Sequence, residues 1–173
     1  MQYKKLTELY EEIVSTTKRL EKTAILSKFL KQLEDSDRDV LYLLLGDIYP
    51  EYDKRKIGIS NQIAIKAISK ATGIDEKQVV HEWKVIGDLG KVAEKLAGKK
   101  RQSTLHSHIL TTEKVIENLR KLPELEGKGT VGKKLALITE LLSSASPVEA
   151  LYLIRTLIGD LRIGLKESTI RDA

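Results

Sequence analysis

Apolar residues recur at helical spacing along nearly the whole chain, and this pattern restricts the fold more than any other feature. Leu6, Leu9, Tyr10 and Ile13 fall on one face of a helix, and similar three- and four-residue spacings continue to the C-terminal segment. No segment shows the strict alternation of apolar and polar residues that is typical of a half-buried strand. The sequence therefore predicts an all-α fold, a compact domain of several helices.

Capping signals predict where the helices begin and end. Ser36 followed by Asp39 resembles a capping box and predicts a helix that continues through Ile48. Ser146 and Glu149 form the usual capping box, with a proline at the first helical position between them. The same kinds of signal predict further helix limits at Ser60, Gly73, Asp75, Gly87, Gly98, Thr112 and the glycine-rich turn of residues 127–132.

Positive charge is concentrated in one quarter of the chain. The 173 residues carry a net charge of +5, and residues 91–134 contain 11 basic and 5 acidic side chains, a net +6. Such a block favours a polyanionic partner, although a solvated helix face accounts for the charge alone equally well. The chain contains no cysteine, and its apolar runs are far shorter than the roughly 20 residues that cross a bilayer. We therefore expect a cytoplasmic protein that does not enter a membrane.

The two ends of the chain resemble each other, which predicts an internal duplication. Leu-Tyr-Leu-Leu at 41–44 and Lys-Ile-Gly-Ile at 56–59 have counterparts in Leu-Tyr-Leu-Ile at 151–154 and Arg-Ile-Gly-Leu at 162–165. Two helix-pair units related by a pseudo-two-fold axis would direct the turns at Gly58 and Gly164 the same way, toward the two strands of a duplex. The alternative is two unrelated helix ends, where glycine is common.

The residues beside these two glycines suit contacts to phosphate. A glycine lets the main chain approach an anion closely, and the free N–H groups and dipole of the next helix attract it. Ser60 follows Gly58 by two positions, and Arg162 and Lys166 flank Gly164. Such residues hold a duplex without reading its bases, and an aromatic content of 5% argues against stacking on single strands. We expect sequence-independent duplex binding.

A glycine-rich segment at 127–134 resembles a nucleotide-binding loop only in part. Its sequence fits G-x-x-x-x-G-K, but Lys134 stands where a serine or threonine would hold Mg²⁺, and no strand is predicted before it. Thr130, Lys133 and Lys134 lie at the start of a predicted helix, which favours a phosphate of DNA over a nucleotide. A solvated turn is the alternative.

Side chains that would form a catalytic centre do not come together in the sequence. His106 and His108 lack a carboxylate cluster at metal-ligand spacing, and His81 lies beside Trp83 in a predicted helix, where a structural role is expected. No arrangement resembles a catalytic triad or an acid–base pair. We therefore expect no catalytic, cofactor-binding or metal-binding residue in this chain.

Four blocks in the same order resemble the N-terminal DNA-binding domain of archaeal-type ATP-dependent DNA ligases. They lie at residues 54–74, 87–94, 127–142 and 150–170, and the resemblance as a whole extends over almost the whole chain. The resemblance implies an all-helical, roughly two-fold symmetric domain that holds nicked duplex DNA through backbone contacts in the minor groove. It implies positioning roles for Gly58, Ser60, Thr130, Lys133, Lys134, Arg162, Gly164 and Lys166.

The same resemblance implies that residues 1–173 form one domain of a longer enzyme. These ligases adenylate the lysine of a Lys-x-Asp-Gly motif in a nucleotidyltransferase domain, followed by an OB-fold; the motif does not occur in this chain. ATP and Mg²⁺ are therefore implied for the full-length ligase, acting in DNA replication, repair and recombination, and no cofactor for this domain. We expect a monomer that is associated with the nucleoid.

A second kind of partner is implied by the family's sliding-clamp motif, a glutamine followed by paired aromatic residues. Gln102 and Leu105 lie at the matching place, but leucine and histidine stand where the aromatic residues are expected, which weakens the inference. The alternative to DNA binding is accordingly a helical protein-interaction module that docks the clamp or another acidic partner without direct DNA contact.

Overall fold

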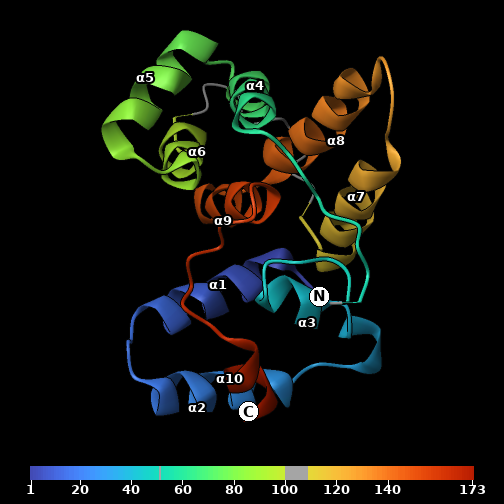
Figure 1. Cartoon of the computed structure of the whole chain (residues 1–173). Coiled ribbons are helices and arrows are strands. Elements are labelled where there is room, and N and C mark those ends of the chain that lie inside the picture. Colours follow the sequence, from blue (N-terminus) through green and yellow to red (C-terminus); the bar gives the residue numbers. More distant parts are fainter. Residues whose placement is uncertain (51, 100–108) are drawn as a thin grey trace.

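The computed structural model describes residues 1–50, 52–99 and 109–173, and within these ranges every regular element is a helix. This confirms the predicted all-α class (Figure 1). The elements are α1 (Tyr3–Val14), α2 (Arg19–Leu30), the 3₁₀ turn η1 (Asp35–Asp37), α3 (Val40–Leu44), α4 (Asn61–Thr72), α5 (Glu76–Ile86), α6 (Leu89–Ala97), α7 (Thr112–Glu124), α8 (Thr130–Ser144), α9 (Pro147–Leu157) and α10 (Glu167–Arg171).

Helix α9 is the centre of the structure. Every residue from Glu149 to Leu157 is buried, because a helix that is apolar on nearly all sides needs neighbours on all sides. It packs against α6, α1 and α8, and in Figure 1 it lies between α1, α2, α3 and α10 below and α4, α5 and α6 above. The two groups of helices therefore share α9 as a common core.

Aromatic side chains join α9 to the lower group. The rings of Tyr10 and Tyr152 lie 4.8 Å apart between centroids, tilted by 54°. The Tyr10 hydroxyl donates to the carbonyl of Leu43 at 2.8 Å, which ties α1 to α3. Burial raises the pKa of the Tyr10 hydroxyl well above its usual value, since the charged form would lose its hydration.

Most of the predicted helix limits are confirmed by their backbone geometry. Ser60 accepts a hydrogen bond from the amide of Ile63 and caps α4, which ends at Gly73 with φ of 74°. Ser146 and Glu149 form both bonds of the predicted capping box at the start of α9. Within the described residues, no helix is long and apolar enough to span a membrane.

The predicted capping box at Ser36 and Asp39 is wrong. Ser36 lies within η1, and α3 begins at Val40 without a side-chain cap. The Asp39 carboxylate instead accepts from Arg120 of α7 at 2.7 Å, so a tertiary ion pair replaces the local cap. Helix α3 also ends at Leu44 rather than Ile48, since the chain turns left-handed directly afterwards.

Helix α7 begins at Thr112, as predicted, and Thr111 caps it by accepting from the amide of Lys114. One other limit needs correction, since Gly132, expected in the turn, lies in the first turn of α8. Trp83 on α5 is partly buried against the core, and α5 lies at the edge of the upper group (Figure 1).

Candidate nucleic-acid interface

Helices α3 and α9 end in the same backbone motif. Gly46 and Gly159 follow them with φ of 75° and 74°, in the left-handed region that favours glycine. The next amides, of Asp47 and Asp160, donate to carbonyls five residues earlier at 3.0 and 2.9 Å, as in a Schellman motif. This local likeness is consistent with the predicted duplication, whose pseudo-two-fold arrangement stays a prediction.

The turn at Gly58 borders the end of α9. Lys56 to Ile59 and Thr156 to Gly159 line a groove of about 340 Å³ together with residues 45–47. Gly58 has φ of 56° and is exposed, as is Ser60, which begins the cap of α4. The Lys56 ammonium lies 3.7 Å from the Asp47 carboxylate at the rim of this groove. Backbone and cation are thus available to a ligand at one place.

The turn at Gly164 is attached to a different part of the molecule. Lys22 on α2 donates to the carbonyls of Ile163 and Gly164 at 3.0 and 3.1 Å. Gly164 has φ of 63°, and Lys166 is exposed at the start of α10. Lys22 therefore fixes the main chain of this turn against α2, while Lys166 stays accessible.

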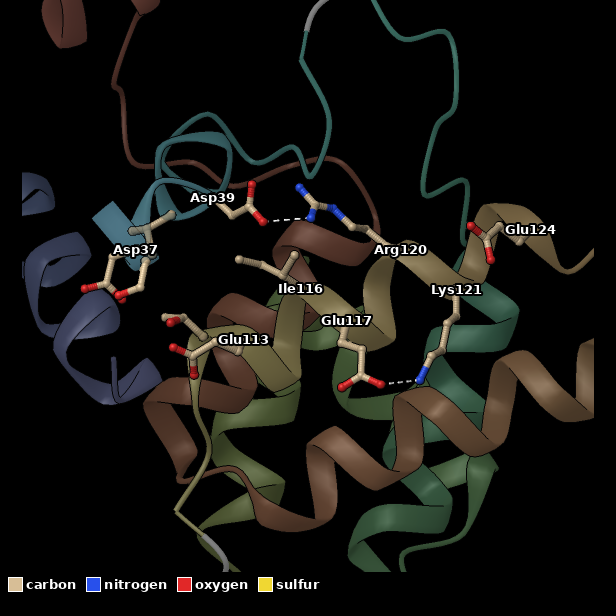
Figure 2. A pocket seen from close by; sticks show the side chains of 11 residues that line it. Asp37, Asp39, Glu113, Ile116, Glu117, Arg120, Lys121 and Glu124 are labelled. Carbon is tan, nitrogen blue, oxygen red and sulfur yellow. Dashed lines mark hydrogen bonds and ion pairs between the residues drawn. The ribbon is translucent and has the colours of Figure 1, made fainter. Parts of the chain in front are cut away.

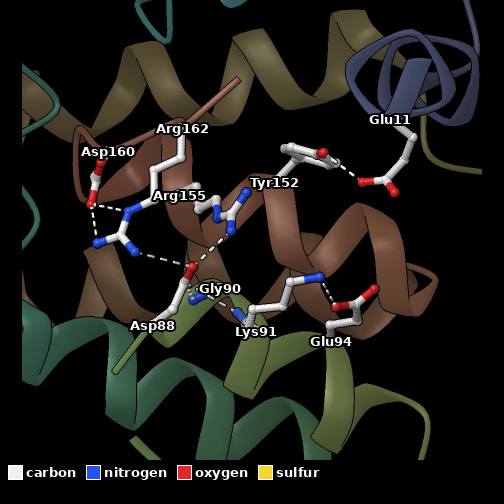
Figure 3. A network of polar contacts seen from close by, with 9 residues as sticks. All are labelled: Glu11, Asp88, Gly90, Lys91, Glu94, Tyr152, Arg155, Asp160 and Arg162. Atoms are coloured by element: carbon white, nitrogen blue, oxygen red, sulfur yellow. Dashed lines mark hydrogen bonds and ion pairs between the residues drawn. The ribbon is translucent and has the colours of Figure 1, made fainter. Parts of the chain in front are cut away.

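Arg162, two residues before Gly164, belongs to a network of four charged side chains (Figure 3). Its guanidinium lies 2.6 Å from the Asp160 carboxylate and 3.4 Å from that of Asp88, which comes from the cap of α6. Asp88 also accepts from Arg155 of α9 at 2.7 Å, and both of these side chains are about one-tenth exposed. Arg162 is half exposed, so the network runs from the core to the surface.

Asp88 divides its two carboxylate oxygens between a helix cap and the arginines. Oδ1 accepts from the amides of Gly90 and Lys91 at 2.8 and 3.2 Å, and Oδ2 faces Arg155 and Arg162. Burial raises the pKa of Asp88, but the hydrogen bonds from Arg155 and from the two amides outweigh it, so the net pKa lies below its usual value. Asp88 is therefore a buried, charged anchor.

Gly90, the second glycine of the segment Gly-Asp-Leu-Gly at 87–90, lies where α6 and α9 are in close contact. A Cβ at this position would lie 2.8 Å from the carbonyl oxygen of Leu151 and 2.8 Å from Cγ of Arg155. Helices α6 and α9 thus approach more closely than a side chain permits. The sequence offered one signal of this contact that was missed, namely the single arginine in the otherwise apolar stretch 150–158.

The start of α8 has an open arrangement. Gly129, with φ of 85°, precedes the helix and provides no side-chain cap, and no acidic residue occupies the first turn. The Thr130 hydroxyl donates to the carbonyl of Gly127 at 2.9 Å. Lys133 and Lys134 form no ion pair with the described part of the chain. Free amides and unpaired cations therefore converge at this helix end.

The structure distributes the eight predicted DNA contacts over three places. Gly58 and Ser60 lie beside the end of α9, and Arg162, Gly164 and Lys166 lie on the connection from α9 to α10. Thr130, Lys133 and Lys134 start α8, whose upper end in Figure 1 lies well apart from that connection. Gln102 and Leu105, predicted to contact a clamp, lie outside the described residues, as do His106 and His108.

A groove of about 410 Å³ between α3 and α7 has the opposite character (Figure 2). Five carboxylates and only two cations line it, over an apolar floor that includes Val40 and Ile116. Arg120 and Lys121 already pair with carboxylates in this groove, at 2.7 and 2.6 Å. An anion would be repelled here, so this groove is not a phosphate site. Among the described residues, no group of three or more histidine, aspartate or glutamate side chains is placed to hold a metal ion.

Comparison with known proteins identifies the family. The family described as "DNA ligase N terminus" matches residues 2–173. The chain is 40% identical to the DNA ligases of Methanosphaera stadtmanae and Methanobrevibacter smithii over 99% and 100% of its length, and 35% identical to that of Thermococcus onnurineus over 100%. It spans 31%, 32% and 31% of these three relatives. The chain thus belongs to the DNA ligase N-terminus family and corresponds to about a third of an archaeal DNA ligase.

Proposed function

We propose that this chain binds duplex DNA without sequence specificity and positions a nick for sealing by the full-length ligase. The open start of α8 is the observation that carries the proposal. A helix N-terminus attracts anions, and cations in its first turn are unfavourable unless an anion shares the site. Lys133 and Lys134 are the fourth and fifth residues of α8, and no acidic residue occupies its first turn. A DNA phosphate supplies the missing negative charge.

The other two predicted contact regions supply the same chemistry. Gly58 exposes main chain beside Lys56, and Arg162 and Lys166 expose cations next to Gly164. Contacts of this kind engage phosphate and sugar, fix the register of a duplex, and carry no base information. Three such regions, spread over the molecule, suit a long backbone better than a small ligand.

The chemical step is assigned to the remainder of the ligase. We propose that ATP and Mg²⁺ act in a nucleotidyltransferase domain that carries the Lys-x-Asp-Gly motif absent from these 173 residues. The role of this chain is then to hold the two DNA ends in line, in replication, repair and recombination. Binding energy from a remote, non-reacting part of the substrate is used for orientation at the reacting centre.

The partners expected besides DNA belong to the same proposal. A sliding clamp would engage the segment that contains Gln102 and Leu105, which lies outside the described residues. We propose a monomer on cytoplasmic, nucleoid-associated DNA, because one nick needs one ligase.

Fluorescence anisotropy with nicked duplex, intact duplex and single-stranded DNA at several salt concentrations tests the proposal. If about five phosphates are neutralised, log K falls against log salt with a slope of about −4 to −5. The double variant Lys133→Glu/Arg162→Glu should weaken duplex binding strongly. The matched control is Lys5→Glu/Lys28→Glu, which has the same charge change and lies in the acidic surroundings of a groove between α1 and α2.

Two outcomes would overturn the proposal. If wild-type chain fails to bind duplex at low salt, the chain is not a DNA-binding domain by itself, and a helical protein-interaction module becomes the favoured function. If the control variant weakens binding as much as the test variant, the named residues do not form the interface.

A further inference from the structure

The backbone of Arg162 is strained. Its φ is 55°, and it is the one residue other than glycine with positive φ among those that the structure describes. A long side chain in the left-handed region is unfavourable and persists where the surrounding structure over-determines it, often at functional sites. The contacts that hold Arg162 in this conformation therefore indicate the function of its side chain.

The side chain of Arg162 is held on its inner edges and free on its outer edge. A guanidinium has five N–H donors. Nε and Nη2 face the Asp160 carboxylate at 2.6 Å, and Nη1 donates to Asp88 at 3.4 Å (Figure 3). Three donors are thus directed at carboxylates, and the remaining two have no partner in the described part of the chain. With the side chain 49% exposed, these two are available to solvent.

The anchor on the inner side is rigid. Asp88 is fixed by two amides at the start of α6 and by Arg155, itself buried in α9. On the other side of Arg162, Lys22 holds the carbonyls of Ile163 and Gly164. Arg162 therefore connects Asp88, which lies 74 residues earlier in the sequence, to the turn that Lys22 holds.

We infer that Asp88 and Asp160 are positioning residues that hold the Arg162 guanidinium ready for a DNA phosphate. This inference rests on the proposed function. An arginine loses much side-chain freedom when it binds, and one that is already held loses less, so the phosphate is bound more tightly. The two outer N–H groups match two oxygens of one phosphate, the bidentate arrangement that arginine favours.

The opposing effect is repulsion between the carboxylates and the phosphate. Asp160 is about half exposed, where water and salt screen such repulsion strongly, and Asp88 is separated from the surface by the guanidinium itself. We therefore expect the gain in phosphate affinity from positioning Arg162 to exceed the loss from carboxylate–phosphate repulsion.

The test measures nicked-duplex affinity of Asp160→Asn over a range of salt. We expect affinity to fall about threefold while the salt slope stays unchanged, because rotamer freedom returns but no cation is lost. Arg162→Gln should lower the affinity and also reduce the magnitude of the salt slope, by about 0.9. Asp35→Asn is the matched control, since it removes one charge from an exposed ion pair with Arg38 and should leave affinity unchanged.

A double-mutant cycle separates positioning from other effects. In the Arg162→Gln background, Asp160→Asn should have no further effect on affinity, because its action passes through the arginine. Asp88→Asn keeps an oxygen for the α6 cap and should weaken binding about tenfold, provided circular dichroism shows it folded. If it does not fold, the Asp160 cycle decides alone.

The outcomes distinguish the two proposals. Failure of the wild-type chain to bind duplex overturns the proposed function. If wild type binds and Arg162→Gln weakens binding, while Asp160→Asn is neutral or tightens it, only the positioning role is overturned. A loss on Asp160→Asn that persists without the arginine also overturns it.

Discussion

Two cationic regions of this domain present charge in opposite ways. Arg162 and Arg155 are each paired with a carboxylate, and these ion pairs lead through Asp88 into the contact between α6 and α9. At the start of α8, Lys133 and Lys134 have no carboxylate partner among the described residues, and the helix end has no side-chain cap. The cations of the first region are bonded to buried side chains, whereas those of the second lie on a helix end without such bonds.

This difference determines what a substitution changes. Removing Asp88 alters packing, helix capping and surface charge together, because its one carboxylate bonds the α6 cap, the buried Arg155 and the exposed Arg162. Removing a lysine from α8 alters surface charge alone. Stability and DNA binding should therefore be coupled in the first region and separable in the second.

The largest effect is expected for Arg155→Met. The variant keeps the apolar stem but leaves the buried Asp88 carboxylate without its closest cation, 2.7 Å away. Breaking a buried pair in this way costs about 3–5 kcal/mol of unfolding free energy, measured by urea denaturation. Lys133→Met is the matched control and should not lower the unfolding midpoint. Equal, small effects of both variants would show that the network contributes little to the core.

A second effect contrasts two helical glycines. At Gly90 a methyl group would meet the Leu151 carbonyl oxygen at 2.8 Å, whereas at Gly132 in α8 it would meet nothing within 4 Å. We expect Gly90→Ala to lower the unfolding free energy by about 1–3 kcal/mol. Gly132→Ala should raise it by about 0.5–1 kcal/mol, since alanine restricts the unfolded chain. Thermal unfolding of both variants checks the opposite signs.

The sequence predicted elements where local signals decide the structure and failed where distant contacts do. Ser60, Gly73 and the capping box at Ser146 act on their own helices, so their patterns were sufficient. Asp39 failed as a cap because its carboxylate bonds Arg120, 81 residues later, a partner that no local pattern reveals.

The candidate interface shows the same division. Gly58, Gly164 and the lysines of α8 could be named from glycines and charges at predicted helix ends. The role of Asp88 was missed because its partners, Arg155 and Arg162, follow 67 and 74 residues later. Only the approach of α6 to α9, which Gly90 permits, brings them together.

A smaller effect is expected in acid. The pKa of Asp88 lies below its usual value. Burial raises this pKa, but hydrogen bonds from Arg155 and two amides lower it by a larger amount. A carboxylate with a depressed pKa stabilises the fold above its unfolded pKa of about 3.9, and this contribution is lost as pH falls through the folded value.

The acid prediction is checked by urea unfolding of wild type and Asp88→Asn between pH 6 and pH 2.5. The stability difference between them should be constant above about pH 4 and shrink below it. A difference that stays constant down to pH 2.5 would mean that the charge on Asp88 does not stabilise the fold.

The smallest effect on stability, and the sharpest contrast between the regions, is expected for Lys133→Gln/Lys134→Gln. Lys133 and Lys134 are the fourth and fifth residues of α8, near the helix end where positive charge opposes the helix dipole, so their removal should raise the unfolding midpoint slightly. The same variant should weaken duplex binding and reduce the salt slope by about 1.8, since two phosphate contacts are lost. Arg162→Gln should instead lower affinity without raising the midpoint, because its guanidinium also neutralises Asp88 and Asp160. If the lysine variant lost stability together with affinity, α8 would be as integrated into the fold as the Arg162 network, and the distinction between a built-in and an attached cation would not hold.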